Sequence, residues 1–537
     1  MDPENDTGNI EYKLKLIDKD NNRIETLATQ MRYRCAEGEG ECIYNLGIED
    51  DGTMTGITEK EYIETIKNIN IIASKNNYSV KILSSTAVSD GKHIYEVLIR
   101  EINQNKYIDI KIAIAGTVDA GKSSILGCLT TGKNDNGRGF ARSFVFNYVH
   151  ELKSGRSSSI SHQILGFDYE GKVINAQGLN KLTWTDILQR SSKVISFFDL
   201  CGHEKYLKTT ILGLTSSFPD ICMIIIDANN GVKPITKEHI FLCITLKIPF
   251  IIIISKIDIC KERQNVLKET IQSINKFLKY PGIRRMPVLI ETQDDIILCS
   301  KNIYADSITP VFQTSCVTGE GLDDLKTFLN ITPKKPIKYE ANIDVVELHI
   351  DHVFNVHGFG LVIGGHLMNG IINIGDKLLV GPHSGLYDPI TIRSIYCKKT
   401  PLQQVKHGSY VCLGIKKADK INIKRGNVVI SNKTDKLIVR EFTAEINVLR
   451  THSTTVRVGY EPMFNGYSIR QVSKIIEIKN KKNARGDIIN DTEDILRNGD
   501  TALVVLRFKY HPEYLKIGTR FILSEGKCKI VGEVIKN

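Results

Sequence analysis

Between residues 106 and 332, short runs rich in Ile, Val and Phe are separated by stretches with helical spacing. The runs are YIDIKIAIA, KVISFFDL, DICMIIIDA, PFIIIISKID and PVFQTSC. Runs that are apolar at nearly every position are typical of strands buried on both faces, so they predict a mostly parallel sheet covered by helices. Polar motifs directly follow several runs, and ligands bind at the carboxyl ends of strands in such sheets.

Different patterns flank this segment. Before it, helical spacing over residues 59–76 places Ile63, Ile66, Ile69 and Ile72 on one expected stripe, and strand-like segments follow. After the linker at 332–340, short strands separated by glycine turns run to the C-terminus and predict two antiparallel barrels. We therefore expect a multidomain protein with a small N-terminal α/β domain (1–105), an α/β domain with a mostly parallel sheet (106–332) and two β-barrels (333–435 and 436–537).

Composition narrows the class of protein. No apolar run approaches the roughly 20 residues that span a bilayer, and the polar start MDPENDTGNIEYK does not resemble a targeting peptide. The 12 cysteines are scattered without a CxxC pair, which favours neither a zinc site nor a disulfide framework. We expect a cytoplasmic protein with no membrane partner.

The net charge of +10 is unevenly distributed. From residue 333 onward there are 32 Lys and Arg against 20 Asp and Glu, whereas the preceding residues carry a small net negative charge. A basic C-terminal half predicts a polyanionic partner there. Charge alone does not decide whether this half binds RNA, DNA or the ribosome, or is only a well-solvated surface.

The segment GTVDAGKS at 116–123 matches GxxxxGK[ST] between a predicted strand and a predicted helix. Gly116 and Gly121 permit a tight loop whose amides cradle phosphates, and the helix dipole adds to this. Lys122 would bridge the β- and γ-phosphates, and Ser123 would coordinate Mg²⁺. The remaining residues expected around the phosphates are Thr117, Val118, Asp119, Ala120 and Ser124.

The segment DLCGHEKY at 199–206 follows another predicted strand. A nucleotide hydrolase needs an acid near its metal, a backbone amide that senses the γ-phosphate and a group that orients water. Asp199 can hold Mg²⁺ through a water molecule, and Gly202 can approach the γ-phosphate because it lacks a Cβ. His203 is the candidate catalytic residue.

Two further strand ends predict which base is bound. Asp258 of SKID (255–258) can accept hydrogen bonds from guanine N1–H and the 2-amino group, while the stem of Lys256 packs on the ring. In TSCVTGEGL (314–322), Ser315 and the amide of Cys316 can meet guanine O6. Together with the flanking Ser255 and Val317, these segments favour guanine over adenine.

Taken together, these motifs resemble translational GTPases of the elongation factor Tu and elongation factor 1-alpha kind, and most closely the eukaryotic GTP-binding protein 1 and 2 group. The closer resemblance covers nearly the whole chain. It rests on YNLGIEDDGTMTGIT, AGTVDAGKSS, DNGRGFARS, ELKSGRSSS, ILGFDYEGKVIN, DLCGHEKYLKTT, VTGEGLDDLKTFLN, VGYEPM, LRNGDTALV and HPEYLKIGTRFIL.

The resemblance implies a GTPase domain with two barrels, Mg²⁺-dependent hydrolysis of GTP to GDP and phosphate, and binding of aminoacyl-tRNA, ribosomes or other RNA complexes. His203 falls on the catalytic histidine of the family. Asp119 falls on an acid that helps hold a monovalent cation in relatives, although a loop-stabilising Asx residue would look the same. We expect a monomer that binds no DNA.

The resemblance also locates switch I within 132–170, a polar stretch too long for an ordinary connection. By register with the elongation factors, Ser159 takes the place of the hydroxyl that binds Mg²⁺, and Ser157 or Ser158 remain alternatives. Ser255 stands where most relatives have the Asn of NKxD. Cys201 stands where relatives have Pro or Ala, and we interpret it as a small buried residue rather than a reactive thiol.

Three functions fit this picture. The first is a tRNA-delivering or ribosome-associated factor, and the second is a GTP-gated RNA adaptor in surveillance or decay. The third is a GTPase that drives a metabolic partner such as a sulfate-activating enzyme, for which basic barrels have no use.

Overall fold

The computed structural model describes residues 3–5, 7–17, 21–89, 91–102, 107–146, 151, 160–175, 182–202, 207–280, 283–335, 345–357, 360–383, 385–417, 422–448, 455–483, 487–488, 495–525 and 528–537. The chain forms two compact units. The first comprises Met1–Gly202, Asp220–Lys237 and Pro249–Pro336, and the second His203–Pro219, Glu238–Ile248 and Ile337–Asn537. Across the described ranges, no helix has the length and apolar character that crossing a bilayer requires.

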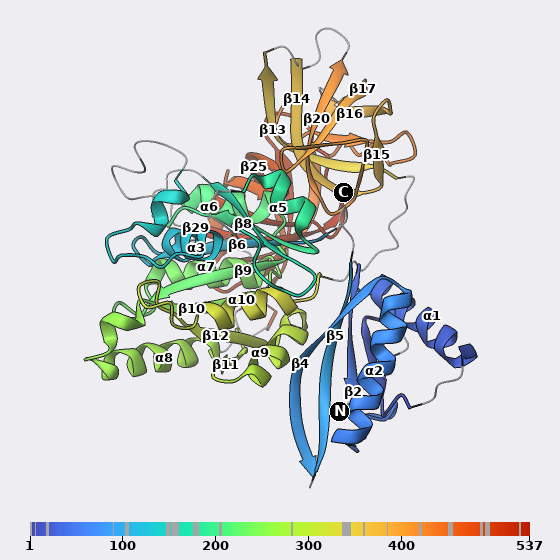
Figure 1. Cartoon of the computed structure of the whole chain (residues 1–537). Helices are drawn as coiled ribbons and strands as arrows, with labels where there is room; N and C mark the ends of the chain where they lie inside the picture. The colour runs from blue at the N-terminus through green and yellow to red at the C-terminus, as the bar shows by residue number, and fades with distance from the viewer. Residues whose placement is uncertain are drawn as a thin grey trace. The chain divides into compact units, whose positions relative to one another are not determined.

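The N-terminal domain is a five-stranded sheet with two helices on one face (Figure 1). Strands β2 and β4 both pair antiparallel with β5, which makes β5 the central strand of the pairing. The helices α1 and α2 share an apolar core with this sheet. The elements are β1 (Ile10–Lys13), α1 (Asn21–Glu37), β2 (Glu41–Leu46), β3 (Ile57–Thr58), α2 (Glu59–Lys75), β4 (Tyr78–Ser89) and β5 (Lys92–Glu101).

Helix α2 begins where the helical spacing predicts, with Thr58 and Glu61 forming a capping box. The expected stripe is wrong at one end. Ile69 and Ile72 are fully buried, whereas Ile63 is 59% exposed. Three-residue steps lag an α-helix by about 60° each, so nine residues separate Ile63 from Ile72 by half a turn.

The second domain contains a seven-stranded sheet in the order β11-β12-β10-β9-β6-β8-β7. All neighbouring pairs are parallel except β7, which runs antiparallel to β8 at the edge. The strands are β6 (Ile108–Gly116), β7 (Ser161–Phe167), β8 (Lys193–Asp199), β9 (Ile221–Asp227), β10 (Phe250–Ser255), β11 (Met286–Leu289) and β12 (Ile308–Gln313). The prediction of a mostly parallel sheet is confirmed, although β7 and β11 were not among the expected strands.

Helices α3, α9 and α10 contribute to the same apolar core as this sheet. Because the sheet is buried on both faces, its strands carry the continuous apolar runs seen in the sequence. The helices are α3 (Lys122–Thr131), η1 (Ala141–Phe144), α5 (Trp184–Arg190), α6 (Leu207–Ser216), α7 (Pro234–Thr245), η3 (Ile257–Cys260), α8 (Gln264–Leu278), α9 (Gln293–Lys301), η4 (Ile303–Ala305) and α10 (Leu322–Ile331).

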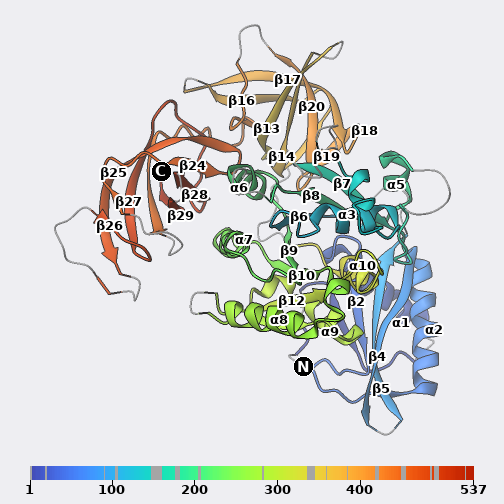
Figure 2. The same ribbon diagram turned by 90° about the vertical axis from the view of Figure 1, so that its left-hand side faces the viewer.

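Two antiparallel six-stranded barrels follow, as predicted (Figure 2). The first closes through the pairing of β16 with β17, and the second closes through β22 and β29. Their strands and the short strands beside them are β13 (Glu347–Val356), β14 (Gly360–Asn369), β15 (Ile371–Asn373), β16 (Lys377–His383), β17 (Leu386–Cys397), β18 (Thr400–Leu402), β19 (Gln404–Lys406), β20 (Tyr410–Lys417), β21 (Val428–Ile430), β22 (Glu441–Val448), β23 (Val456–Arg457), β24 (Met463–Gly466), β25 (Ile469–Lys482), β26 (Ile495–Leu496), β27 (Thr501–Phe508), β28 (Arg520–Glu525) and β29 (Cys528–Lys536).

Candidate nucleotide site

The predicted phosphate loop lies between β6 and α3. Gly116 has φ +153°, and a Cβ at this position would lie 2.5 Å from the carbonyl oxygen of Ile225 on the neighbouring strand. Gly121 has φ +93° and caps the N-terminus of α3. Both positions therefore require glycine, because other side chains would collide or adopt an unfavourable left-handed conformation. The loop opens onto a helix N-terminus, which suits an anion.

Lys122 is buried and curls over the loop. Its Nζ donates hydrogen bonds to the carbonyl oxygens of Gly116 (3.2 Å) and Thr117 (3.0 Å). Burial lowers the pKa of Lys122 below 10.5, although the nearby charge of Asp199 opposes the shift. A phosphate chain beside this ammonium would add its negative charge to that of Asp199.

We expect GTP binding to take up a proton at Lys122. The pKa of Lys122 is lowered in the free protein, and bound phosphates raise it. Between the pKa of the free protein and that of the complex, the complex therefore holds more protons than the free protein. GTP affinity falls as the pH rises through this interval. Calorimetry in buffers of different ionisation enthalpy measures the uptake. Lys122→Arg should abolish it because a guanidinium stays protonated, whereas the same uptake in that variant would contradict the assignment.

The two predicted metal ligands of the phosphate loop and β8 meet directly. Ser123 Oγ donates to Asp199 Oδ2 at 2.6 Å, and the Asp199 side chain is fully buried at the end of β8. A hydroxyl beside a carboxylate is an oxygen donor set that suits Mg²⁺, which takes its remaining ligands from water and phosphate oxygens. No group of three or more His, Cys, Asp or Glu side chains that could bind a metal occurs in the described ranges. The residues present thus fit magnesium held jointly with a nucleotide.

Gly202 lies against the phosphate loop. A Cβ on Gly202 would be 2.3 Å from Lys122 Nζ and 2.6 Å from the carbonyl oxygen of Gly116, so the main chain approaches as closely as a glycine allows.

Cys201 is buried, as expected, and burial together with the charge of Asp199 raises its pKa to about 11. This shift disfavours a reactive thiolate. His203 lies outside the described residues.

The two base-recognition segments are joined by one short hydrogen bond. Ser315 Oγ donates to Asp258 Oδ1 at 2.6 Å and accepts from the amides of Val317 (3.2 Å) and Thr318 (3.1 Å). Ser315 therefore holds the carboxylate while it orders the loop after β12. The amide of Asp135, in the segment where switch I begins, donates to the Cys316 carbonyl oxygen at 2.8 Å.

The hydroxyl of Ser255 joins two segments of the site. Its Oγ donates to the carbonyl oxygen of Ala120 at 2.6 Å and lies 3.2 Å from that of Ile226. The side chain is 1% exposed. The hydroxyl of Ser255 therefore fastens the phosphate loop to the strand that precedes Asp258.

Two contacts of the site were not expected from the sequence. Lys256 Nζ donates to the carbonyl oxygen of Asp119 at 2.5 Å and forms an ion pair with Asp227 at 2.8 Å. Burial would raise the pKa of Asp227, but the hydrogen bond and charge of Lys256 outweigh it and lower the value. Asp227 ends β9, and its position at a strand terminus was the only available sequence signal.

Hydrogen bonds, close approaches and adjoining backbone thus bring most of the predicted residues together. They are Gly116, Thr117, Asp119, Ala120, Gly121, Lys122, Ser123, Asp199, Gly202, Ser255, Lys256, Asp258 and Ser315. Val118 and Ser124 are partly exposed in the loop and the first turn of α3, and Val317 is exposed beside Cys316. The alternatives for the switch I ligand, Ser157, Ser158 and Ser159, lie outside the described residues.

Comparisons with known proteins agree with this geometry. The family model described as "Elongation factor Tu GTP binding domain" matches residues 109–353. GTP-binding protein 2 of Homo sapiens is 38% identical over 544 residues, which cover 99% of this chain and 88% of that protein. GTP-binding protein 1 of Xenopus laevis is 38% identical over 531 residues, covering 98% of this chain and 78% of that protein.

The fold is also found among solved structures. Translation elongation factor SelB from Methanococcus maripaludis, in complex with the GTP analogue GppNHp, matches with a TM-score of 0.55 and 18% identity. The match covers 80% of this chain and 79% of that one. The arrangement of a nucleotide-binding domain and barrels is therefore shared with an elongation factor.

Proposed function

Because the chain belongs to the family of GTP-binding proteins 1 and 2 within the translational GTPases, we propose that its GTP form binds aminoacyl-tRNA or a ribosomal complex. The chain is a GTPase. In the proposal, hydrolysis to GDP and phosphate ends the bound state. The protein acts as a cytosolic monomer, and neither a membrane nor DNA takes part.

Each part of the site has a task in this proposal. The loop amides and Lys122 hold the β- and γ-phosphates, and Asp258 with Ser315 selects guanine. The bound Mg²⁺ neutralises the phosphate charge, and Ser123, Asp199 and the switch I hydroxyl at Ser159 would hold it. Asp119 is the proposed neighbour of a monovalent cation. The full set of proposed nucleotide contacts is Gly116, Thr117, Val118, Asp119, Ala120, Gly121, Lys122, Ser123, Ser124, Gly202, Ser255, Lys256, Asp258, Ser315, Cys316 and Val317.

The proposed hydrolysis has no covalent intermediate. The loop amides and Lys122 stabilise the negative charge that develops on the transferring phosphoryl group. The amide of Gly202 faces the γ-phosphate, and the imidazole of His203 orients the attacking water. Water positioning requires a bound partner in this proposal, so hydrolysis without a partner is slow.

The proposal of an RNA partner rests on the positive charge of the barrels. The excess of Lys and Arg lies wholly beyond residue 332, and basic side chains reach solvent on both barrels. Those exposed on the second barrel include Arg457, Arg470, Lys474, Lys482 and Arg497. Side chains of this kind neutralise backbone phosphates, which gives RNA binding its affinity and its dependence on salt.

Filter binding of aminoacyl-tRNA tests the proposal. We expect at least about tenfold tighter binding with a non-hydrolysable GTP analogue than with GDP, because nucleotide state and RNA are coupled by a typical allosteric free energy. Affinity should fall steeply with salt. Deacylated tRNA is the matched control and should bind more weakly.

The other functions predict different outcomes in the same assay. Equal binding of aminoacylated and deacylated tRNA would favour an RNA surveillance or decay adaptor. Absence of RNA binding in both nucleotide states would contradict any RNA partner and favour a GTPase that drives a metabolic enzyme.

A further inference from the structure

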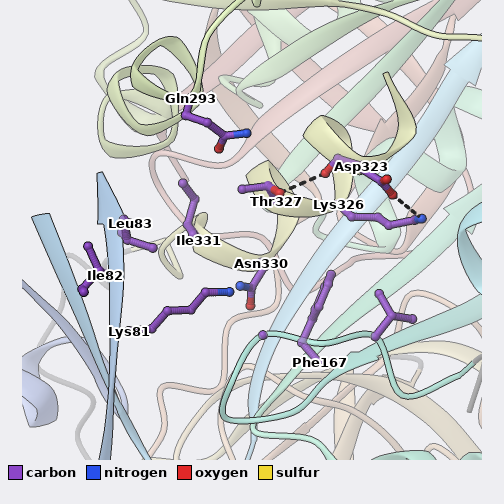
Figure 3. A pocket seen from close by; sticks show the side chains of 12 residues that line it. Lys81, Ile82, Leu83, Phe167, Gln293, Asp323, Lys326, Thr327, Asn330 and Ile331 are labelled. Atoms are coloured by element: carbon purple, nitrogen blue, oxygen red, sulfur yellow. Dashed lines mark hydrogen bonds and ion pairs between the residues drawn. The ribbon is translucent and has the colours of Figure 1, made fainter. Parts of the chain in front are cut away.

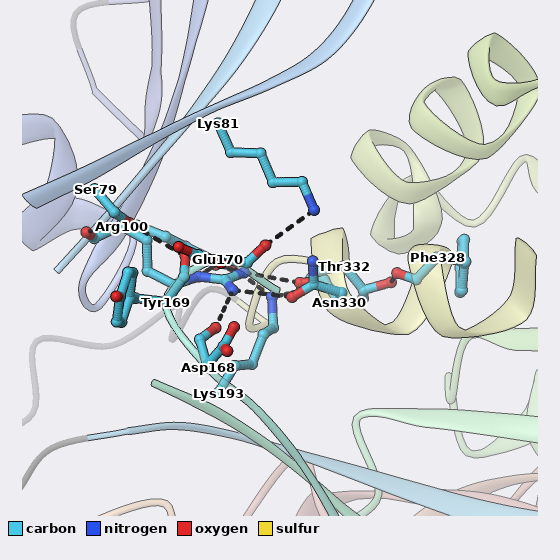
Figure 4. Close-up of polar contacts among 11 residues, drawn as sticks. Ser79, Lys81, Arg100, Asp168, Tyr169, Glu170, Lys193, Phe328, Asn330 and Thr332 are labelled. Atoms are coloured by element: carbon cyan, nitrogen blue, oxygen red, sulfur yellow. Dashed lines mark hydrogen bonds and ion pairs between the residues drawn. The ribbon is translucent and has the colours of Figure 1, made fainter. Parts of the chain in front are cut away.

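A buried charge cluster joins the N-terminal domain to the GTPase domain (Figure 4). Arg100 of β5, 1% exposed, donates to Glu41 of β2 from Nη2 at 2.8 Å and from Nε at 3.1 Å. The same guanidinium donates to the side-chain oxygen of Asn330 at 2.9 Å and to its carbonyl oxygen at 3.0 Å. Asn330 belongs to α10, so the cluster fixes the N-terminal sheet against the GTPase domain.

The cluster extends to the first residue of β8. Lys193 is fully buried, and its Nζ donates to Glu41 at 2.7 Å and to the carbonyl oxygen of Thr332 at 2.5 Å. Glu41 therefore lies between Arg100 and Lys193 and forms an ion pair with each, so its single negative charge is shared between two cations. Buried charges keep such geometry because loss of one partner leaves another unpaired in a medium of low dielectric.

The N-terminal domain also binds the turn that follows β7. Three consecutive carbonyl oxygens of this turn accept hydrogen bonds from the domain: Asp168 from Arg100 Nη1 (3.4 Å), Tyr169 from Ser79 Oγ (3.2 Å) and Glu170 from Lys81 Nζ (3.0 Å). Such contacts fix the position of a main-chain segment and not merely of its side chains. We call Glu41, Ser79, Lys81 and Arg100 the clamp.

The clamp and the magnesium site lie at opposite ends of one strand pair. In the antiparallel register, Phe167 pairs with Lys193 beside the clamp, and Ser161 pairs with Asp199. Asp199 in turn accepts the hydrogen bond of Ser123. The pair spans about 20 Å at the usual rise per residue. The clamp thus fixes the outer end of a strand pair whose other end carries Asp199.

Polar contacts rather than dense packing hold this junction. A cavity of about 380 Å³ opens beside the clamp, and Figure 3 shows Lys81 of β4 and Asn330 of α10 on its wall. The apolar contact across the junction includes Leu83 of β4, which packs against the core of the GTPase domain. Phe167 anchors the end of β7 in the core of the GTPase domain, and the clamp supplies the contacts of the N-terminal domain with the turn that follows.

We infer that the N-terminal domain is a positioning element for GTP. It holds the outer end of the β7–β8 pair in place, so Asp199 at the other end is already positioned when the γ-phosphate and its magnesium bind. GDP binding depends mainly on the phosphate loop and the base-recognition segments, which the clamp does not contact. Loss of the clamp therefore weakens GTP more than GDP, because the strands must then be ordered at the moment of binding.

The triple variant Glu41→Gln/Arg100→Met/Lys193→Met tests this inference. It replaces the buried charges together by neutral side chains of similar length, which avoids leaving one of them unpaired. In stopped-flow titrations of the full chain with fluorescent nucleotides and Mg²⁺, we expect GTP affinity to fall about 5- to 20-fold, within the range of typical coupling between sites. GDP affinity should change less than about twofold.

A second variant covers the case in which the triple replacement does not fold. Ser79→Ala/Lys81→Met removes the side-chain contacts with Tyr169 and Glu170, together with a hydrogen bond from Ser79 to the carbonyl oxygen of Arg100, and leaves the buried charges unchanged. Lys81 is exposed. This double variant should weaken GTP selectively by a few-fold. The matched control is Lys301→Met, which breaks an ion pair with Glu96 that joins the same two domains through α9, away from β7 and β8.

The ratio of GTP to GDP affinity separates positioning from a merely structural role. The inference requires a lowered ratio in the clamp variants and an unchanged ratio in Lys301→Met. Equal weakening of both nucleotides, an unchanged ratio in the double variant, or the same lowered ratio in the control would each overturn it.

Discussion

Replacement of Asp258 by asparagine is expected to convert the protein from a guanine-nucleotide to a xanthine-nucleotide binder. The carboxylate can accept from guanine N1–H and from the 2-amino group. The asparagine oxygen can still accept from N1–H, but its NH₂ group meets the 2-amino group, so two donors face each other. Xanthine carries a carbonyl at that position and restores a matched pair.

The expected effect is large because one charge-assisted hydrogen bond is lost and two donors are left unpaired. These terms are worth about 1.5–3 and about 1–3 kcal/mol, so GTP affinity should fall by at least about 100-fold. Calorimetric titration with GDP measures the loss of guanine affinity, and titration with xanthosine diphosphate measures the gain of xanthine affinity.

Ser315→Ala is the matched control for this exchange. It removes the hydroxyl that holds Asp258 at 2.6 Å but keeps the carboxylate. We expect guanine affinity to fall about tenfold or less, with no gain of xanthine binding. An unchanged preference for guanine in Asp258→Asn would show that another residue selects the base.

The nucleotide site was predictable because its motifs are local. Gly116, Gly121 and Lys122 follow one strand within a few residues, and the geometry they need is encoded in the spacing itself. The same holds for Asp199 with Gly202 and for the strand ends that carry Asp258 and Ser315. Parallel topology then brings these strand ends to one edge of the sheet.

Contacts between distant segments could not be predicted in this way. The hydroxyl of Ser255 binds a carbonyl of the phosphate loop 135 residues earlier, and Lys256 bridges that loop to Asp227. No periodicity identifies such partners. The buried charge cluster of Arg100, Glu41 and Lys193 is a stronger case, because these residue types are usually found at the surface and are buried here as mutually paired groups.

Some elements were missed although the sequence contained their pattern. The apolar positions Leu27, Ala28, Met31 and Cys35 are buried in α1 and follow helical spacing. In contrast, β7 lies at the sheet edge, and its sequence SHQILGF lacks the continuous apolar character of the central strands. The central strands could therefore be identified from the sequence, whereas the edge strand β7 could not.

Replacement of His203 by alanine is expected to abolish partner-stimulated hydrolysis while leaving GTP affinity within about tenfold. The proposed imidazole acts on water and not on the ground-state nucleotide, so its loss should appear in the rate of hydrolysis rather than in binding. Loss of a positioned group of this kind costs about 10²–10⁴-fold. Single-turnover hydrolysis of bound GTP with saturating ribosomes measures the effect.

The geometry of the preceding residue supports this expectation. Gly202 has no room for a Cβ between Lys122 and the phosphate loop, so the residue before His203 lies against the phosphate-binding surface. His203→Gln is the graded control, because an amide can still orient water, and it should retain an intermediate rate. If His203→Ala lost as much GTP affinity as hydrolysis rate, the histidine would act by binding GTP itself. A group that acts only on the water molecule leaves the affinity for GTP intact.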